Sequence, residues 1–481
     1  MGFDSSPATM PAPSALACSQ GPSWFRESRL GVSFHWGVAS VPGRGDGWLR
    51  SREQMGLAAY ERFFQGFQPT ADWAPRWAAA VRGAGAGYAF LTAKHHDGFC
   101  LWPSALTDYH VGRTPARGRD LVREFVETTR AAGLKVGLYY SLVDWRHPDY
   151  PHFGDRQHPL RFDAEARVEE PRRDFTRYVD FLHGQVRELL SGYGPLDLLV
   201  LDFSYWDLVG EAWRGAELMR MIRDLQPGIA VNDRLEPDAI KRDAPPPWAG
   251  DFDTAELNIP REQPRAPSGR PLPFDAWFPL GRNWFHDEED AARIAGRKSA
   301  RTIIRALVNC ASKNGNLNLN LAPDPSGRLH PHDVAALEAI GEWMRVNREA
   351  IDGAGAADLP KPEWGRWTQR GSTLYAHLLE PVIGHLSLPG LRGRVRRARV
   401  LATGRDAFLG NYWNVGVQQF DAPDDLFLNF EEPLGDTYPL PDATDTVIAL
   451  DLATSAAERT ALLAPLDAER QRAFSERRPN S

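Results

Sequence analysis

Apolar and polar residues along the first 350 positions alternate between short apolar runs and longer amphipathic stretches. The apolar runs predict strands within 29–37, 87–99, 134–145, 196–207 and 229–234, with 251–259 and 315–323 as further candidates. Between them, apolar residues spaced three and four apart predict helices over 119–133, 171–194, 217–228 and 290–312. Strands that alternate with helices and are apolar almost throughout indicate a parallel sheet covered by helices.

The number of strand–helix units points to one architecture. About eight units over roughly 300 residues suit a (β/α)8-like, TIM-type barrel. A doubly wound sheet is the alternative, but no glycine-rich phosphate loop follows the first strand. After about residue 355, short β-like runs separated by Gly, Pro and Asp predict a C-terminal antiparallel β-sandwich. The expected organisation is a flexible leader (1–22), a catalytic domain (23–353), the sandwich (354–452) and a charged helical or disordered tail (453–481).

Composition narrows the class of protein. The net charge of -7 gives no sign of a nucleic-acid partner. No apolar run approaches the roughly 20 residues of a membrane span. The first twenty residues lack the basic start and continuous apolar stretch of a signal peptide, so we expect a cytoplasmic protein. Cys18, Cys100 and Cys310 are too few and too scattered for a disulfide framework or a zinc site.

Polar side chains recur where the predicted strands end. They are His35, His95, Tyr140, Asp202 and Arg234. A barrel builds its active site at the carboxyl ends of its strands, so these residues are better candidates for an active site than ordinary surface groups are. Asp202 closes the apolar run "LDLLVL", yet a helix cap or a surface ion pair explains an aspartate there equally well. Asp207 lies beyond the strand and is the weaker choice.

Glycoside cleavage needs a second carboxylate, since one group acts at the sugar carbon and the other protonates the leaving oxygen. Glu256 in "TAELN" is the candidate, although Asp251, Asp253 and Glu262 are nearby and spacing alone does not rank the four. Arg234 in "NDR" could hold a carboxylate by a bidentate contact or form an ordinary surface ion pair.

The adjacent pair His95 and His96 bears on the kind of chemistry. Successive residues of a regular strand point to opposite sides, so both rings could face one metal only across a local bulge. Neutral imidazoles that hydrogen-bond to sugar hydroxyls need no such irregularity. One of the two histidines could also simply be satisfied in the wall of the core.

Several motifs together resemble the α-L-fucosidases of glycoside hydrolase family 29. In order, they are "FHWG", "KHHDGFCLW", "GRDLV", "GLKVGLYYSLVDW", "NDR", "DFDTAE" and "SKNGNLNLNLAPDPSG", and the resemblance runs from about Trp24 to about Ile351. It implies a barrel that hydrolyses terminal α-L-fucosides with retention and without a metal or cofactor. It places the nucleophile at Asp202 and the acid/base at Glu256. It assigns substrate binding to His35, Trp48, His95, His96, Tyr140, Arg234 and Trp284.

The sequence departs from the family pattern at two positions. Phe203 follows the nucleophile where relatives commonly have glycine, and Phe278 stands where many have glutamate. Three alternatives therefore stay open: a metal-assisted hydrolase using His95, His96 and Asp97, a non-catalytic fucose-binding relative, and a glycosidase for another 6-deoxy or galacto-configured sugar. The expected partner is a fucosylated oligosaccharide or glycoconjugate, with no nucleic acid or membrane, and a homo-oligomer is left open.

Overall fold

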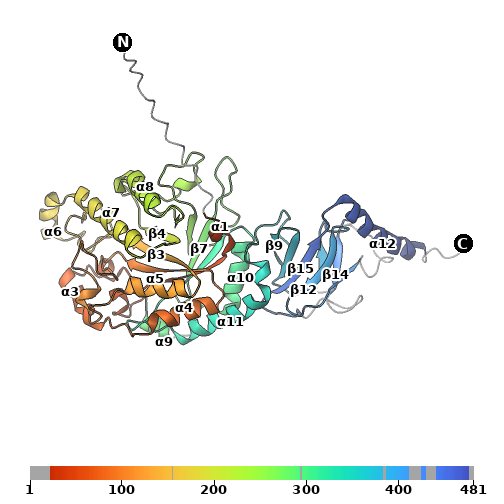
Figure 1. Ribbon diagram of the computed structural model, residues 1–481, viewed down its shortest axis with the longest axis horizontal. Helices are drawn as coiled ribbons and strands as arrows, with labels where there is room; N and C mark the ends of the chain where they lie inside the picture. Colours follow the sequence, from red (N-terminus) through yellow and green to blue (C-terminus); the bar gives the residue numbers. More distant parts are fainter. Residues whose placement is uncertain are drawn as a thin grey trace, which may run out of the picture.

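The computed structural model describes residues 22–153, 155–292, 295–382, 386–410, 424–429 and 440–475. Figure 1 shows two parts side by side, a larger helix-covered sheet and a smaller all-β part that carries helix α12 at its far end. Residues 1–21 of the predicted leader and 476–481 of the predicted tail lie outside the described residues.

The larger part is built on one parallel sheet of eight strands. They are β1 (Leu30–Phe34), β2 (Tyr88–Lys94), β3 (Lys135–Ser141), β4 (Leu198–Asp202), β5 (Ala230–Val231), β6 (Asp253–Glu256), β7 (Phe274–Pro279) and β8 (Asn316–Leu321). Their order is β5-β4-β3-β2-β1-β8-β7-β6, and a parallel bridge between Asn232 and Phe252 joins the two edges. This confirms the predicted barrel-like fold. Strand β7 was not predicted, because a proline-rich segment precedes this short run.

Helices cover the outside of this sheet (Figure 1). The longer ones are α4 (Trp73–Gly83), α5 (Leu121–Ala131), α7 (Phe175–Gly192), α8 (Gly215–Leu225), α10 (Ala300–Ala311) and α11 (Pro331–Asn347). Short helices are α1 (Ser23–Glu27), α2 (Leu49–Arg52), α3 (Leu57–Glu61), α6 (Ala164–Glu169) and α9 (Glu288–Ala292).

Side-chain caps set where two of the predicted helices begin. The Asp174 carboxylate accepts a hydrogen bond from the Thr176 amide, so α7 begins at Phe175, inside the predicted 171–194. The Ser299 hydroxyl caps α10 in the same way. The predicted helix over 290–312 is therefore divided, with α9 ending at Ala292 and α10 beginning at Ala300.

Alternation along each strand decides which side chains face the barrel axis. In β4, Leu199 and Leu201 pack in the cluster formed with the surrounding helices, whereas Leu198 and Val200 belong to a separate, largely aromatic inner cluster. Asp202 has the parity of the inner residues. The strand therefore delivers this carboxylate to the inside of the barrel at its carboxyl end.

The smaller part is the predicted β-sandwich. One sheet has the order β12-β15-β10-β9 and the other β11-β14-β13. The strands are β9 (Gly365–Arg370), β10 (Thr373–Leu378), β11 (Leu386–Leu388), β12 (Val395–Val400), β13 (Phe408–Gly410), β14 (Leu426–Asn429) and β15 (Thr446–Leu452). Leu374, Leu388 and Leu428 from both sheets share one core, and helix α12 (Ala456–Ser475) packs against it through Leu466.

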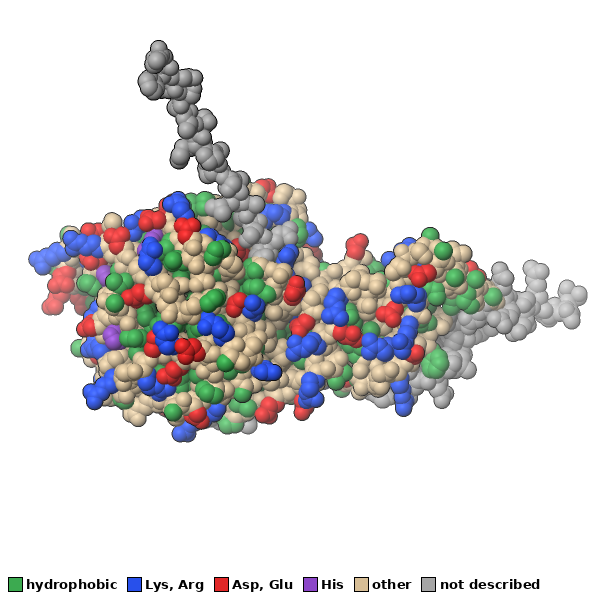
Figure 2. All heavy atoms as spheres, viewed as in Figure 1, with side chains coloured by type: hydrophobic (Ala, Val, Ile, Leu, Met, Phe, Trp, Pro, Cys, Tyr) green, Lys and Arg blue, Asp and Glu red, His purple; other side chains and the backbone are tan. Residues whose placement is uncertain are grey.

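Acidic and basic side chains are interleaved over the face shown in Figure 2, in keeping with the small net charge. Within the part of the chain that the structure describes, no helix is long and apolar enough to cross a membrane.

Candidate active site

Asp202 lies at the carboxyl end of β4 and is held from two sides. The Tyr139 hydroxyl donates to its Oδ2 at 2.7 Å, and Arg234 Nη1 lies 3.5 Å from its Oδ1. Its side chain is 15% exposed. Burial raises the pKa of Asp202 above its ordinary value, partly offset by the Arg234 charge, and the nearby charge of Glu256 raises it further. Asp202 is therefore a mostly buried carboxylate whose contacts only partly offset the cost of burying its charge.

Arg234 connects this carboxylate to Glu256, the last residue of β6. Arg234 Nη2 lies 3.1 Å from Glu256 Oε2, so one guanidinium spans both carboxylates. Burial alone would lower the pKa of Arg234, but Asp202 and Glu256 raise it on balance. Glu256 is 40% exposed and thus lies at the solvent side of the pair. The two predicted catalytic carboxylates therefore meet at one positive charge.

His95 and His96 follow β2 directly and their rings lie side by side, with centroids 3.9 Å apart. Regular alternation does not apply to them, because the pairing of β2 with β3 shifts register between Thr92 and Lys94 and the strand ends there. Burial lowers the pKa of both imidazoles well below the usual range, and neighbouring histidines lower it further. Both rings are therefore neutral near pH 7.

Hydrogen bonds orient two of the pocket histidines. Asn320 donates its amide to the Trp284 carbonyl, so its oxygen accepts from His35 Nδ1 at 2.6 Å. Ser141 donates to the Val143 carbonyl, and its oxygen accepts from His96 Nδ1 at 2.8 Å. Both rings then present Nε2 as an acceptor for hydroxyl groups. Burial lowers the pKa of His35 to about 4, which keeps this tautomer neutral.

His95 contributes differently. Its Nδ1 is buried and has no hydrogen-bond partner among the described residues, so it is available to a ligand. The ring stacks on Tyr139 at 5.6 Å and packs 4.9 Å from Phe285. It also comes so close to Gly47 that a Cβ at that position would lie 2.3 Å from the ring. Glycine at position 47 therefore makes room for this histidine.

The third residue of the possible metal triad turns away from the histidines. Asp97 accepts hydrogen bonds from the Tyr60 hydroxyl at 2.7 Å and from the Phe99 amide at 3.1 Å. Over the described ranges, no group of three His, Cys, Asp or Glu side chains is arranged to hold a metal ion. The His95–His96–Asp97 arrangement therefore gives no support to the metal-assisted alternative.

Aromatic rings form one wall beside these polar groups. Trp48 and Phe203 lie 4.6 Å apart, and their ring centroids are 5.0 and 4.4 Å from that of His96. Trp284 lies 5.2 Å from His35. Phe278, in contrast, packs against the outer, helix-facing cluster, so the departure from glutamate at this position is directed away from the barrel interior.

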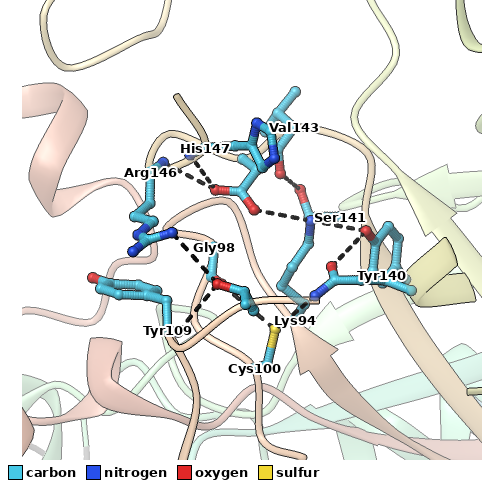
Figure 3. A network of polar contacts seen from close by, with 12 residues as sticks. Lys94, Gly98, Cys100, Tyr109, Tyr140, Ser141, Val143, Arg146 and His147 are labelled. Carbon is cyan, nitrogen blue, oxygen red and sulfur yellow. Dashed lines mark hydrogen bonds and ion pairs between the residues drawn. The ribbon is translucent and has the colours of Figure 1, made fainter. Parts of the chain in front are cut away.

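The structure places Tyr140 away from this group, and the expectation that it lines the pocket is corrected. Tyr140 belongs to the outer cluster, and its hydroxyl accepts from Lys94 at 3.0 Å and donates to Gln185 at 2.9 Å. Figure 3 shows Tyr140 turned toward Lys94. The neighbouring Tyr139 faces Asp202 instead. The motif "YYS" offers two tyrosines, and only the parity of the strand distinguishes them.

Sequence reasoning missed two residues of the site. Tyr139 shares its parity with Gly137, where a Cβ would meet Phe90 and Leu198 of the inner cluster, but the sequence alone does not show which parity of this strand faces inward. Phe285, 5.5 Å from His35, lies in the irregular segment after β7, where no periodicity marks its direction. The remaining expected residues form two contact groups around the barrel mouth, and Tyr139 contacts both. Ring contacts link His35, Trp48, His95, His96 and Trp284, and ion pairs link Asp202, Arg234 and Glu256.

Comparisons with known proteins agree with this geometry. A family model described as Alpha-L-fucosidase matches residues 5–349. Human tissue alpha-L-fucosidase is 28% identical over 393 residues, which cover 76% of this chain and 78% of that protein. Alpha-L-fucosidase isoenzyme 1 from Paenibacillus thiaminolyticus is 45% identical, with a TM-score of 0.84 over 90% of this chain and 98% of that one. A GH29 alpha-L-fucosidase from Bacteroides thetaiotaomicron is 25% identical, with a TM-score of 0.72 over 91% and 95% of the two chains. The chain therefore belongs to the α-L-fucosidase family, glycoside hydrolase family 29, and is an enzyme.

Proposed function

We propose that the protein is a retaining exo-glycosidase that hydrolyses terminal α-L-fucosyl linkages through a covalent fucosyl-enzyme intermediate. One observation carries the proposal: Asp202 and Glu256 converge on the single guanidinium of Arg234, beside three neutral histidines. Two carboxylates at one site are the minimum that this reaction requires.

In the first step, Asp202 attacks the anomeric carbon and the bond to the leaving oxygen breaks. Glu256, in its protonated form, gives its proton to that oxygen. The Tyr139 hydroxyl and Arg234 hold the Asp202 carboxylate in one orientation, which limits its motion during attack. A glycosyl ester to Asp202 and the free leaving alcohol are the products of this step.

In the second step, Glu256 removes a proton from water, which attacks the anomeric carbon and releases Asp202. Ester formation has removed the negative charge from Asp202, so Arg234 then faces only the Glu256 carboxylate. Two inversions at one carbon give overall retention.

The neutral histidines suit a sugar better than a charged substrate. His35 and His96 present Nε2 acceptors and His95 a free Nδ1, which match the hydroxyl groups of a pyranose. Trp48 and Phe203 offer an apolar wall for C–H bonds and for a methyl substituent. One methyl group supports about 1–3 kcal/mol of discrimination, so galacto-configured sugars lacking it are the second candidate substrates.

The decisive experiment compares the wild-type enzyme with Asp202→Gly on 4-nitrophenyl α-L-fucoside. We expect the variant to lose turnover and to recover part of it with azide, which replaces the missing nucleophile and yields a fucosyl azide. Glu262→Gln, which changes an exposed carboxylate outside the ion-pair cluster, serves as the matched control. Wild-type rates in Asp202→Gly would eliminate the assignment.

A further inference from the structure

A continuous series of aromatic rings leads from the catalytic carboxylate to the protein surface. Phe203, next to Asp202, lies 4.5 Å from the ring of Tyr205, and Tyr205 lies 4.2 Å from Trp206. At its inner end the series contacts Trp48 of the pocket wall, and at its outer end Trp206 is 41% exposed. A tryptophan with this exposure is uncommon in a protein whose other large apolar side chains are mostly buried.

The backbone of this segment has an unusual conformation at two of the aromatic residues. Phe203 and Trp206 have φ values of 81° and 53°, in the left-handed region that non-glycine residues rarely adopt. Leu257, directly after Glu256, has φ of 55° and is 58% exposed. Each catalytic carboxylate is thus followed within four residues by an exposed apolar side chain on strained backbone. Such strain persists where the surroundings enforce it, and it is concentrated at ligand-binding sites.

The surroundings of Tyr205 hold the series in place. Its hydroxyl donates to Asp155 Oδ1, and Asp155 Oδ2 accepts from Trp145 Nε1 at 2.9 Å and from the Tyr150 hydroxyl at 3.1 Å. Asp155 is fully buried, so these bonds fix the middle of the series from beneath. The guanidinium of the exposed Arg156 lies 4.7 Å from the Trp206 ring centre and adds donors at the outer end.

We propose that Trp206 is the stacking platform of a leaving-group subsite that receives a pyranose sugar, with Leu257 as a second apolar contact. The inference rests on the proposed function, because a fucosyl unit bound at Asp202 directs its leaving group toward the surface. Indole rings cover the C–H face of a pyranose well, and Arg156 supplies donors for its hydroxyl groups. The subsite therefore makes the enzyme selective for fucosylated saccharides over fucosides with small leaving groups.

The test compares kcat/KM on a fucosyl-galactose disaccharide with kcat/KM on α-L-fucosyl fluoride, whose leaving group is a single atom. In Trp206→Ala, we expect the ratio of the two constants to fall about tenfold, as the loss of one stacked ring implies. Trp206→Phe keeps an aromatic ring and should have a ratio close to that of the wild type. This variant keeps the test valid if the alanine variant misfolds. Val346→Ala, at an equally exposed apolar position on α11, is the matched control and should leave the ratio unchanged.

The outcomes separate the two proposals. A ratio in Trp206→Ala equal to that of the wild type, with an unaltered melting temperature, overturns the subsite while the proposed function stands. A wild-type enzyme that releases no fucose from fucosyl fluoride overturns the proposed function and the subsite with it. A ratio of the two kcat/KM values that falls about tenfold in Trp206→Ala but stays near the wild-type value in Trp206→Phe supports the stacking of a sugar on Trp206.

Discussion

Two buried polar networks lie back to back across β3, one residue apart in the sequence. On the inner side, Tyr139 donates to Asp202, where two carboxylates share the one charge of Arg234. On the outer side, Tyr140 contacts the ion pair of Lys94 and Asp144, which is 3.3 Å long and almost completely inaccessible. The inner network has an excess of negative charge and opens to solvent, whereas the outer one is closed and balanced.

The difference indicates that the outer network stabilises the structure, whereas the inner one is suited to catalysis. Asp144 also accepts from the amides of Arg146 and His147. The Trp145 amide donates to the His96 carbonyl, so the outer network fastens the loop after β3 to the histidine segment. Burial alone would raise the pKa of Asp144, but Lys94 and His147 lower it overall. Fully satisfied charges are suited to holding a loop, and partly satisfied ones to reacting.

Replacing Glu256 by Gln should cause the largest change, because it removes the proton donor that we propose for the inner network. We expect kcat/KM on a fucosyl-disaccharide to fall about a thousandfold. Activity on fucosyl fluoride should fall far less, since fluoride departs with little help from a proton. Steady-state rates on the two substrates measure the difference. Equal losses on both would show that Glu256 is not the acid.

Replacing Asp144 by Leu should break the outer network and destabilise the fold. Lys94 is fully buried, and leaving its charge unpaired should lower the free energy of unfolding by about 3–5 kcal/mol, measured by urea denaturation. Lys94→Met in the same chain should recover much of this loss. The control is Lys135→Met, which breaks an exposed ion pair with Asp197 and should cost less than about 1 kcal/mol. Similar costs for Asp144→Leu and the control would contradict the view that the outer network is structural.

The two networks also show which features of the structure could be predicted from the sequence and which could not. Alternating patterns and strand ends were enough for the barrel, the sandwich and the position of Asp202 and Arg234 at the barrel mouth, because these depend on periodicity and parallel topology. Glu256 was singled out by the family resemblance, since spacing alone did not rank it above the neighbouring carboxylates. The choice between Tyr139 and Tyr140 depends on the phase of β3 relative to the barrel axis, which the local pattern leaves open when both side chains are aromatic. Phe285 and the ring series ending at Trp206 lie in irregular segments, whose direction is set by tertiary contacts.

The neutral histidines of the inner side predict a pH dependence of stability. His35 has a folded pKa of about 4, against about 6.5 in the unfolded chain, so the unfolded state binds the proton first as pH falls. Stability should therefore decrease between pH 6.5 and pH 4, with His35 contributing about 3 kcal/mol. Urea denaturation at pH 7 and pH 4.5 should show a smaller decrease in His35→Asn than in the wild type. An unchanged decrease would mean that His35 takes up its proton without unfolding.

Removing one tyrosine hydroxyl at a time should have the smallest effects. It also tests most directly whether the two faces of β3 have different roles. Tyr139→Phe removes a hydrogen bond that lowers the pKa of Asp202, so the acid limb of the kcat/KM profile should move to higher pH and the rate fall about tenfold. Tyr140→Phe should leave that limb in place and cost about 1 kcal/mol of stability, because its hydroxyl serves Lys94 and Gln185. The two variants differ by one position and remove the same atom. If Tyr140→Phe moved the pH profile and Tyr139→Phe did not, the assignment of inner and outer faces along β3 would be reversed, and with it the separation of reactive from structural charges.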